Sequence, residues 1–165
     1  MLAIRLAKIG CVAALALYAA LVAFGNLTDY STNFAFVTHV FDMDAIPAGS
    51  AIQWRAVTSP ALHHAGYILI IAVEILVAAM TGLGALALLR RLKATSRMFQ
   101  EAKGMAIAGL TLAFLLFEGG FVAIGGEWFG MWRSPAWDGV PSAFRIAVTM
   151  LGALIFISMK DEDLA

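Results

Sequence analysis

The stretch LHHAGYILIIAVEILVAAMTGLGALALL, residues 62–89, contains a single carboxylate, Glu74, in an otherwise apolar run. A helix needs about 20 mostly apolar residues to cross the hydrocarbon core of a bilayer, so this stretch predicts a transmembrane helix. Three further stretches have the same character, residues 9–25, 104–124 and 140–159. The last carries Arg145 near its start and reaches spanning length if that side chain extends to the interface. We expect one domain, residues 1–165, that is all-α: a bundle of four transmembrane helices.

The composition supports a membrane location. Hydrophobic residues make up 62% of the chain and charged residues only 13%, whereas soluble domains have about a quarter charged residues. So few charges could not cover a water-facing surface, which makes the lipid bilayer the expected partner. Lys and Arg equal Asp and Glu at 11 each, so nothing suggests nucleic acid. Cys11 is the one cysteine, which excludes an intrachain disulfide and a thiolate metal cage.

The distribution of basic residues predicts the orientation. Membrane proteins concentrate Lys and Arg in cytoplasmic segments. One side of the predicted topology holds Arg5, Lys8, Arg90, Arg91, Lys93, Arg97, Lys103 and Lys160, and the other holds Arg55, Arg133 and Arg145. This bias places both termini and the loop 90–103 in the cytoplasm. Trp54, Trp128, Trp132 and Trp137 fall on the opposite side, where tryptophans anchor helices at the interface.

Two loops lie on the outer, predicted periplasmic side, residues 26–61 and 125–139. The first, at about 35 residues, is too long to be a simple connector. We expect it to be ordered, with a short helix or packed segment lying on the bundle. The second is rich in glycine and tryptophan, and the two loops could pack together as a cap.

Two glutamates lie within predicted spans, Glu74 and Glu118. A carboxylate at membrane depth is costly unless it is paired or protonated, so each is a candidate functional group. From the helix rise, Glu74 lies about 10 Å below Tyr67, and Glu118 about 21 Å above Gly104, so both fall in the outer half of the membrane. Helical phase puts polar residues on one face of each of three predicted helices, and we expect each of these stripes to face the bundle interior: His63, Tyr67 and Glu74; Thr111 and Glu118; and Arg145, Thr149 and Gly152.

The hypothesis is therefore a polar cluster of Glu74, Glu118 and Arg145, with Tyr67 and His63 above it. Two readings remain open. The cluster could be a proton relay or a site for a polar head such as that of a quinone or lipid, or it could be a structural hydrogen-bond network between helices.

The histidines offer little support for a metal centre. His39 with His63 or His64 is the one arrangement that could ligate haem iron, and zinc would need Asp42 or Asp44 in addition. Hydrogen bonding at the interface is the expected role. No metal site, catalytic residue or cofactor is predicted, although haem and quinone remain alternatives.

The first outer loop carries a dense polar pattern: Asn26, Asp29, Tyr30, Asn33, His39 and Asp44. Helix capping is the simplest role for Asn26 and Asp29. The run NLTDYSTNFAFVTHVFDMD, residues 26–44, followed by Trp54-Arg55 and by Tyr67 and Glu74, resembles a bacterial family of predicted small integral membrane proteins, domain of unknown function 2165. The resemblance covers nearly the whole chain and implies a multi-pass protein of the bacterial inner membrane. It implies no reaction, but it points to this outer loop as the place for any site.

Two classes of function follow. The first is a non-catalytic accessory subunit of a larger membrane complex, with a respiratory complex as one candidate. It would use small-residue surfaces such as Gly82, Gly84 and Ala85, or Gly104, Ala108 and Gly109, to contact other subunits or a second copy. The alternative is a redox or transport protein that binds quinone, haem, protons or a small solute at the outer polar cluster. The absence of soluble catalytic motifs favours a protein that is not an enzyme.

Overall fold

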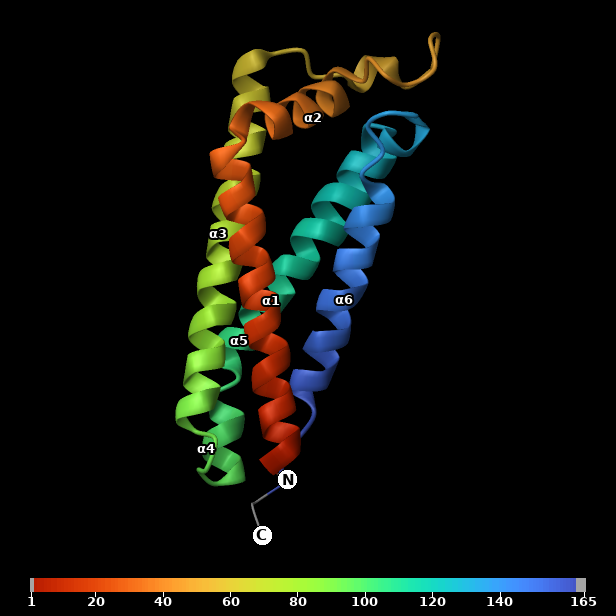
Figure 1. Cartoon of the computed structure of the whole chain (residues 1–165). Helices are drawn as coiled ribbons and strands as arrows, with labels where there is room; N and C mark the ends of the chain where they lie inside the picture. The colour runs from red at the N-terminus through yellow and green to blue at the C-terminus, as the bar shows by residue number, and fades with distance from the viewer. Residues whose placement is uncertain (1, 163–165) are drawn as a thin grey trace.

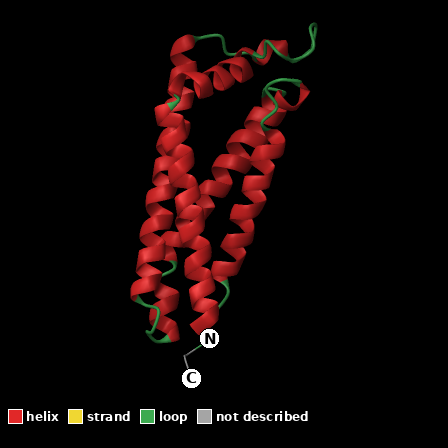
Figure 2. Cartoon of the chain, in the orientation of Figure 1, coloured by secondary structure: helices red, strands yellow, loops and turns green. Residues whose placement is uncertain are grey.

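The computed structural model describes residues 2–162, and every regular element in that range is a helix (Figures 1 and 2). The long helices are α1 (Leu2–Thr28), α3 (Pro60–Arg90), α5 (Gly104–Phe114) continuing into η2 (Leu115–Trp128), and α6 (Val140–Ser158). Short helices connect them: α2 (Tyr30–Asp42), η1 (Gln53–Arg55), α4 (Ser96–Glu101) and η3 (Met131–Arg133). Four segments are long and apolar enough to cross a membrane: Leu2–Thr28, Pro60–Arg90, Ser96–Trp128 and Val140–Ser158. The predicted four-helix transmembrane bundle is confirmed.

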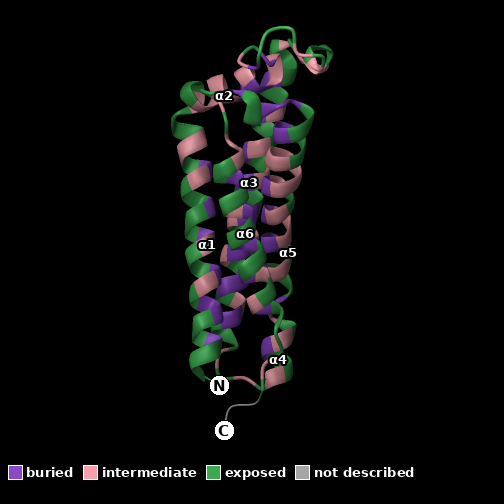
Figure 3. Ribbon diagram, turned by 90° about the vertical axis from the view of Figure 1, so that its right-hand side faces the viewer, coloured by how far each residue is buried: buried purple, intermediate pink, exposed green. Residues whose placement is uncertain are grey.

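The helices sort their side chains by face. On α3, Leu62, Leu69, Leu76 and Leu83 recur every seven residues and are all exposed, as expected of a face turned to lipid. The opposite face is buried against the other helices, as Figure 3 shows for the bundle as a whole. That buried face includes His63, Tyr67 and Glu74, so the predicted interior stripe on this helix is confirmed.

Glycines allow the closest helix contact in the bundle. A Cβ atom on Gly84 of α3 would lie 2.5 Å from the backbone nitrogen of Ala106 on α5. One on Gly109 of α5 would lie 2.8 Å from Thr81 Cγ2 on α3. These two glycines are therefore used within the bundle, while Gly82 and Gly104 have open space around their Cα atoms.

The two halves of the bundle separate toward the α2 end. In Figure 1, α1 and α3 run side by side, and η2 and α6 form a second pair that leans away from the first as it approaches α2. Helix α2 follows α1 after a single residue, Asp29, and crosses over the end of the gap (Figure 1). The expected short helix in the long loop is thus present and roofs the bundle.

The loops 26–61 and 125–139, which the sequence predicts to be outer, pack against each other as a cap. Phe41 of α2 stacks on Phe129 with 5.0 Å between ring centroids, and His39 stacks on Trp137 at 4.4 Å. Arg55 donates to the main-chain oxygen of Trp128 at 3.2 Å and lies over the Trp128 ring. These contacts join α2 and η1 to the end of η2 and the segment that leads into α6.

The third span changes its helical geometry halfway. From Leu115 to Trp128 the chain forms a π-helix, in which hydrogen bonds join residues five apart. The Phe129 N–H continues this pattern by donating to Ile124 O at 3.1 Å. The wider turn shifts the angular position of every side chain relative to the α-helical phase. Glu118 lies in this segment, so the phase that the sequence assigns to it does not apply.

Candidate functional site

The centre of the candidate site is Glu74, near the middle of α3. Its side chain is buried, with 4% exposed, and its Oε2 accepts a 2.7 Å hydrogen bond from the Asn26 side-chain amide on α1. Tyr67 lies on the same face of α3, seven residues before Glu74. Its hydroxyl donates to the main-chain oxygen of Asn26 at 3.1 Å, and Asn26 Oδ1 lies 3.2 Å from the same hydroxyl. Asn26 therefore joins a buried tyrosine and a buried carboxylate between two transmembrane helices.

Neither Asn26 nor Asp29 has the helix-capping role that the sequence predicts. The Asn26 side chain is used by Glu74 and Tyr67. Asp29 occupies the position before α2 but makes no capping hydrogen bond with its side chain. Its main-chain oxygen instead accepts from Asn33 Nδ2 at 3.0 Å. The prediction failed because a buried acceptor, not visible from local sequence, competes for the Asn26 amide.

The other two members of the predicted cluster make no hydrogen bond or ion pair with Glu74 in the described residues, although Arg145 and Glu74 both act electrostatically on Tyr18 of α1. Glu118 is half-buried, and Arg145 is exposed. Neither forms a hydrogen bond or ion pair through its side chain in the part of the chain that the structure describes. Thr149 and Gly152 share the exposure of Arg145, so that stripe of α6 faces outward and not into the bundle. The lack of contact with Glu118 follows from the π-helical turn around it.

A cavity of about 370 Å³ lies against Glu74, between the α1–α3 pair and the η2–α6 pair. Its polar side chains are Asn26, Asn33, Tyr67, Glu74, Asp138 and Ser142. Four aromatic or branched side chains, Phe36, Val37, Ile70 and Phe121, form its inner wall. Small-molecule sites fall in the range of about 300 to 1,000 Å³, with apolar walls and few polar groups, and this cavity has that size and character.

A second cavity of about 390 Å³ lies on the other face of the same gap, between α2, α3 and η2. Every side chain around it is apolar, including Leu69, Val73, Leu116 and Ile124. The same four residues, Phe36, Val37, Ile70 and Phe121, border both cavities. The polar cavity and the apolar cavity are therefore neighbours, with these four side chains between them.

The remaining outer residues form separate groups. Tyr30 Oη and His64 Nδ1 are joined by a 2.8 Å hydrogen bond, and the His64 ring stacks on Phe34 at 4.0 Å. His39 Nδ1 lies 2.8 Å from Asp44 Oδ2.

The buried His63 uses Nε2 to donate to Val57 O at 2.5 Å, with Asp42 Oδ1 at 3.4 Å. Each of the three histidines thus has its own partners. No group of three or more His, Cys, Asp or Glu residues within residues 2–162 is arranged to hold a metal ion.

The opposite end of the bundle carries a buried cluster of cations that sequence reasoning missed. Lys8 and Lys103 both bind the Asp161 carboxylate, Lys8 at 2.9 Å, and both donate to Met159 O, at 2.6 and 2.7 Å. Arg5 is fully buried and donates to Leu92 O, Ala94 O and Glu162 O. These contacts fasten the segment after α6 to the start of α1 and to the α3–α4 turn.

Asp161 takes its charge state from this cluster. Burial raises the pKa of its carboxyl. The hydrogen bonds and positive charges of Lys103 and Lys8 together lower the pKa by more than burial raises it, so it lies below its ordinary value. Asp161 is therefore the anion that holds the two lysines together. The sequence offers two signals for this cluster: Arg5 and Lys8 just before the apolar run that begins at residue 9, and an acidic residue, Asp161, just past the last span. Ordinary interfacial charges give the same pattern.

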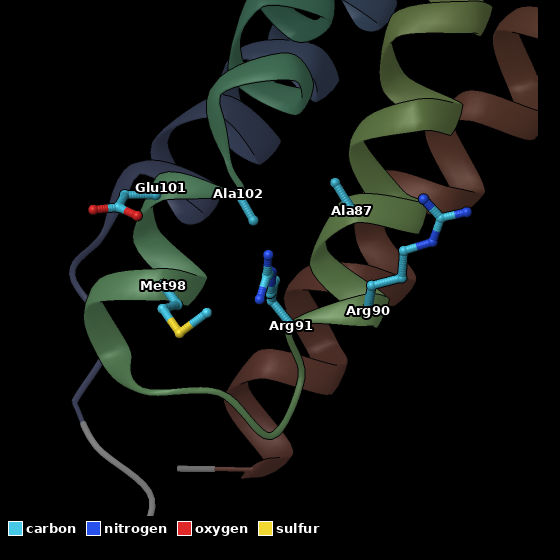
Figure 4. Close-up of a pocket in the computed structure, with 6 residues that line it drawn as sticks. All are labelled: Ala87, Arg90, Arg91, Met98, Glu101 and Ala102. Atoms are coloured by element: carbon cyan, nitrogen blue, oxygen red, sulfur yellow. The ribbon is translucent and has the colours of Figure 1, made fainter.

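A shallow depression lies beside this cluster, between the end of α3 and α4. Ala87, Ala102 and Met98 line it with Arg90, Arg91 and Glu101. Figure 4 shows Arg91 directed into the space between the two helices, while Arg90 and Glu101 point away on opposite sides. Arg90 and Arg91 at its rim belong to the basic loop 90–103 that the sequence predicts.

The model of one protein family, described as "Predicted small integral membrane protein (DUF2165)", matches residues 4–160. No curated protein and no solved structure matches the chain.

Proposed function

We propose a binding function for this chain, which belongs to the DUF2165 family of predicted small integral membrane proteins. The protein binds an amphipathic membrane molecule in the cavity at Glu74. One observation carries the proposal: a carboxylate that is only 4% exposed, held by Asn26, faces a cavity of about 370 Å³ inside a membrane helix bundle. Ionisable groups at membrane depth are costly and mark sites of substrates, ions or protons.

The shape of the gap supports an amphipathic ligand over a water-soluble one. Only a few side chains, among them Phe36 and Phe121, lie between the polar cavity and a wholly apolar cavity. A polar head at Glu74 would therefore leave an apolar tail next to apolar side chains. The protein would act from the outer leaflet of the bacterial inner membrane, with both termini in the cytoplasm, as the distribution of Lys and Arg predicts.

Mass spectrometry of molecules that copurify with the protein tests this proposal. The wild type is compared with Ser142→Phe, which fills the polar cavity from α6, and with Thr149→Phe, a control at an exposed site on the same helix. A bound molecule should be recovered with the wild type and with Thr149→Phe, and lost with Ser142→Phe. Equal recovery from all three, or no recovery from the wild type, would contradict the proposal.

A second candidate is an accessory subunit of a larger membrane complex, for which respiratory complexes are the first to examine. Its support is the open space at Gly82 on α3 and Gly152 on α6, which would allow another helix to approach. Gly84 and Gly109 no longer support it, because both are occupied by contacts within the bundle. Purification at native expression levels in a mild detergent tests it: a stoichiometric large partner would favour this role, and its absence would count against it.

A further inference from the structure

The charged side chains that border the polar cavity are both acidic, Glu74 and Asp138, and none of the residues that border it is Lys, Arg or His. Arg145 of α6 does not border the cavity, although it lies close enough to Tyr18 to act on it electrostatically, as Glu74 does. Glu74 receives one hydrogen bond, from Asn26, and has no cationic partner in the described residues. A phosphate or carboxylate head would meet repulsion here and would lose its hydration without compensation.

The neutral groups of the cavity also favour a cation or a hydrogen-bond donor. Asn26 directs its amide N–H to Glu74, Tyr67 directs its hydroxyl to Asn26, and Asn33 directs its amide to Asp29 O. Each of these three groups already donates one hydrogen bond within the protein, whereas carboxylate oxygens of Glu74 and Asp138 remain to accept from an ammonium head.

Aromatic rings complete the chemistry of a cation site. Phe36, Tyr67, Phe117 and Phe121 all border the polar cavity. Positive charges are attracted to the faces of such rings, and the attraction grows when water is excluded. Acidic and aromatic groups in the same cavity therefore select a positive head.

From these observations we propose that the paired cavities bind a lipophilic monovalent cation, with an ammonium head at Glu74 and Asn26. Its apolar tail passes between the side chains of Phe36 and Phe121, which border both cavities, and lies in the apolar cavity between α3 and η2. The inference rests on the proposed function and specifies the charge of the ligand and the path of its tail.

Two adjacent glycines of η2 provide a matched pair for the tail. Gly120 borders the apolar cavity, and a Cβ there would have Leu116 Cδ1 at 3.7 Å, so a larger side chain would extend into the cavity. Gly119 has nothing within 4 Å of such a Cβ atom and borders neither cavity. Gly120→Leu should therefore fill the tail site, and Gly119→Leu should leave it open.

The experiment measures binding to the full-length protein in phosphatidylcholine nanodiscs by equilibrium dialysis, with empty nanodiscs subtracted. Three radiolabelled probes share one tail: dodecyltrimethylammonium, dodecanol and dodecyl sulfate. The cation should show protein-dependent binding, weakened about tenfold or more by Glu74→Gln and by Gly120→Leu but not by Gly119→Leu. Thermal unfolding of each variant verifies the fold, and the glycine pair keeps the test valid if Glu74→Gln does not fold.

The outcomes separate the inference from the function on which it rests. If the three probes bind equally and Glu74→Gln has no effect, the choice of a cation is wrong while an amphiphile site remains. If the cation binds but Gly120→Leu and Gly119→Leu behave alike, the path of the tail is wrong. If no probe shows protein-dependent binding, both the inference and the proposed function fail.

Discussion

The side-chain amide of Asn26 donates to Glu74 Oε2 across 2.7 Å, joining the end of α1 to the middle of α3. The two residues are far apart in the chain, yet this bond gives a buried carboxylate its one hydrogen-bond donor. In a hydrocarbon environment a carboxylate without a donor is costly. The bond therefore links α1 to α3 and gives the buried Glu74 carboxylate a hydrogen-bond donor.

Replacing Asn26 with Ala should destabilise the protein. Removing one partner of a buried polar pair leaves the other unsatisfied, which costs about 1 to 3 kcal/mol, more for charged groups. Thermal unfolding in detergent measures the loss. Asn33→Ala is the control, since its amide bonds to Asp29 O at an exposed site, and its effect should be smaller. Equal losses of stability for the two substitutions would show that the Asn26–Glu74 hydrogen bond contributes no more to stability than the Asn33–Asp29 bond does.

Gly84→Leu should destabilise the bundle, while Gly82→Leu should not. A Cβ on Gly84 would lie 2.5 Å from the Ala106 nitrogen, which is backbone and cannot move aside, whereas Gly82 has open space. Forcing extra atoms into packed contacts costs about 1 to 3 kcal/mol. Unfolding midpoints of the two variants compare one helix at two neighbouring positions. A normal midpoint for Gly84→Leu would contradict the tight α3–α5 contact.

Much of the fold is readable from the sequence because spanning length and apolarity dominate it. Four helices were expected and four candidate spans are present. The phase of α3 was also readable, since a regular α-helix keeps His63, Tyr67 and Glu74 on one buried face. The hydrogen-bond partner of Glu74 could not be predicted from the sequence, because Asn26 reaches Glu74 only through the packing of α1 on α3.

The third span and the basic end show where sequence reasoning fails. Phase arithmetic assumes α-helical turns, and the π-helix from Leu115 to Trp128 breaks that assumption for Glu118. Charge counting assigns Arg5, Lys8 and Lys103 to the cytoplasmic side, but it does not reveal that all three are buried. The two lysines are paired with Asp161, which lies beyond the last span, and Arg5 is satisfied by main-chain oxygens, and neither kind of partner can be identified from the local sequence.

Glu118 and Glu74 should behave independently. Because no described contact joins them, Glu118→Gln combined with Glu74→Gln should change the free energy of unfolding by the sum of the single effects, within about 0.5 kcal/mol. A close carboxylate pair would instead give a clear interaction energy, since removing one charge would relieve the other. A double-mutant cycle by thermal or denaturant unfolding measures this. A large coupling would restore the carboxylate cluster that the sequence suggested.

Asp161 should make the free energy of unfolding decrease as the pH falls into the acidic range. Burial raises the pKa of this carboxyl, and the lysines Lys103 and Lys8 lower it by more, so the folded pKa lies below the unfolded one. A depressed pKa contributes stability that is fully present above the unfolded value, about 3.9 for Asp. The contribution is lost as the pH falls through the folded value, because protonation removes the anion between the lysines.

Asp161→Asn should remove that contribution at every pH. At neutral pH the variant should lose on the order of 3 kcal/mol, the typical cost of breaking a buried ion pair, and on acidification it should lose less further stability than the wild type. The control is Glu162→Gln, because the Glu162 side chain is exposed and only its main-chain oxygen accepts from Arg5. Unfolding midpoints from pH 7 to about pH 3 distinguish the three proteins across the Asp titration range. Parallel pH profiles for the wild type and Asp161→Asn would mean that Asp161 does not hold Lys8 and Lys103, and that the segment after α6 is fastened by the main-chain bonds to Met159 and Glu162 alone.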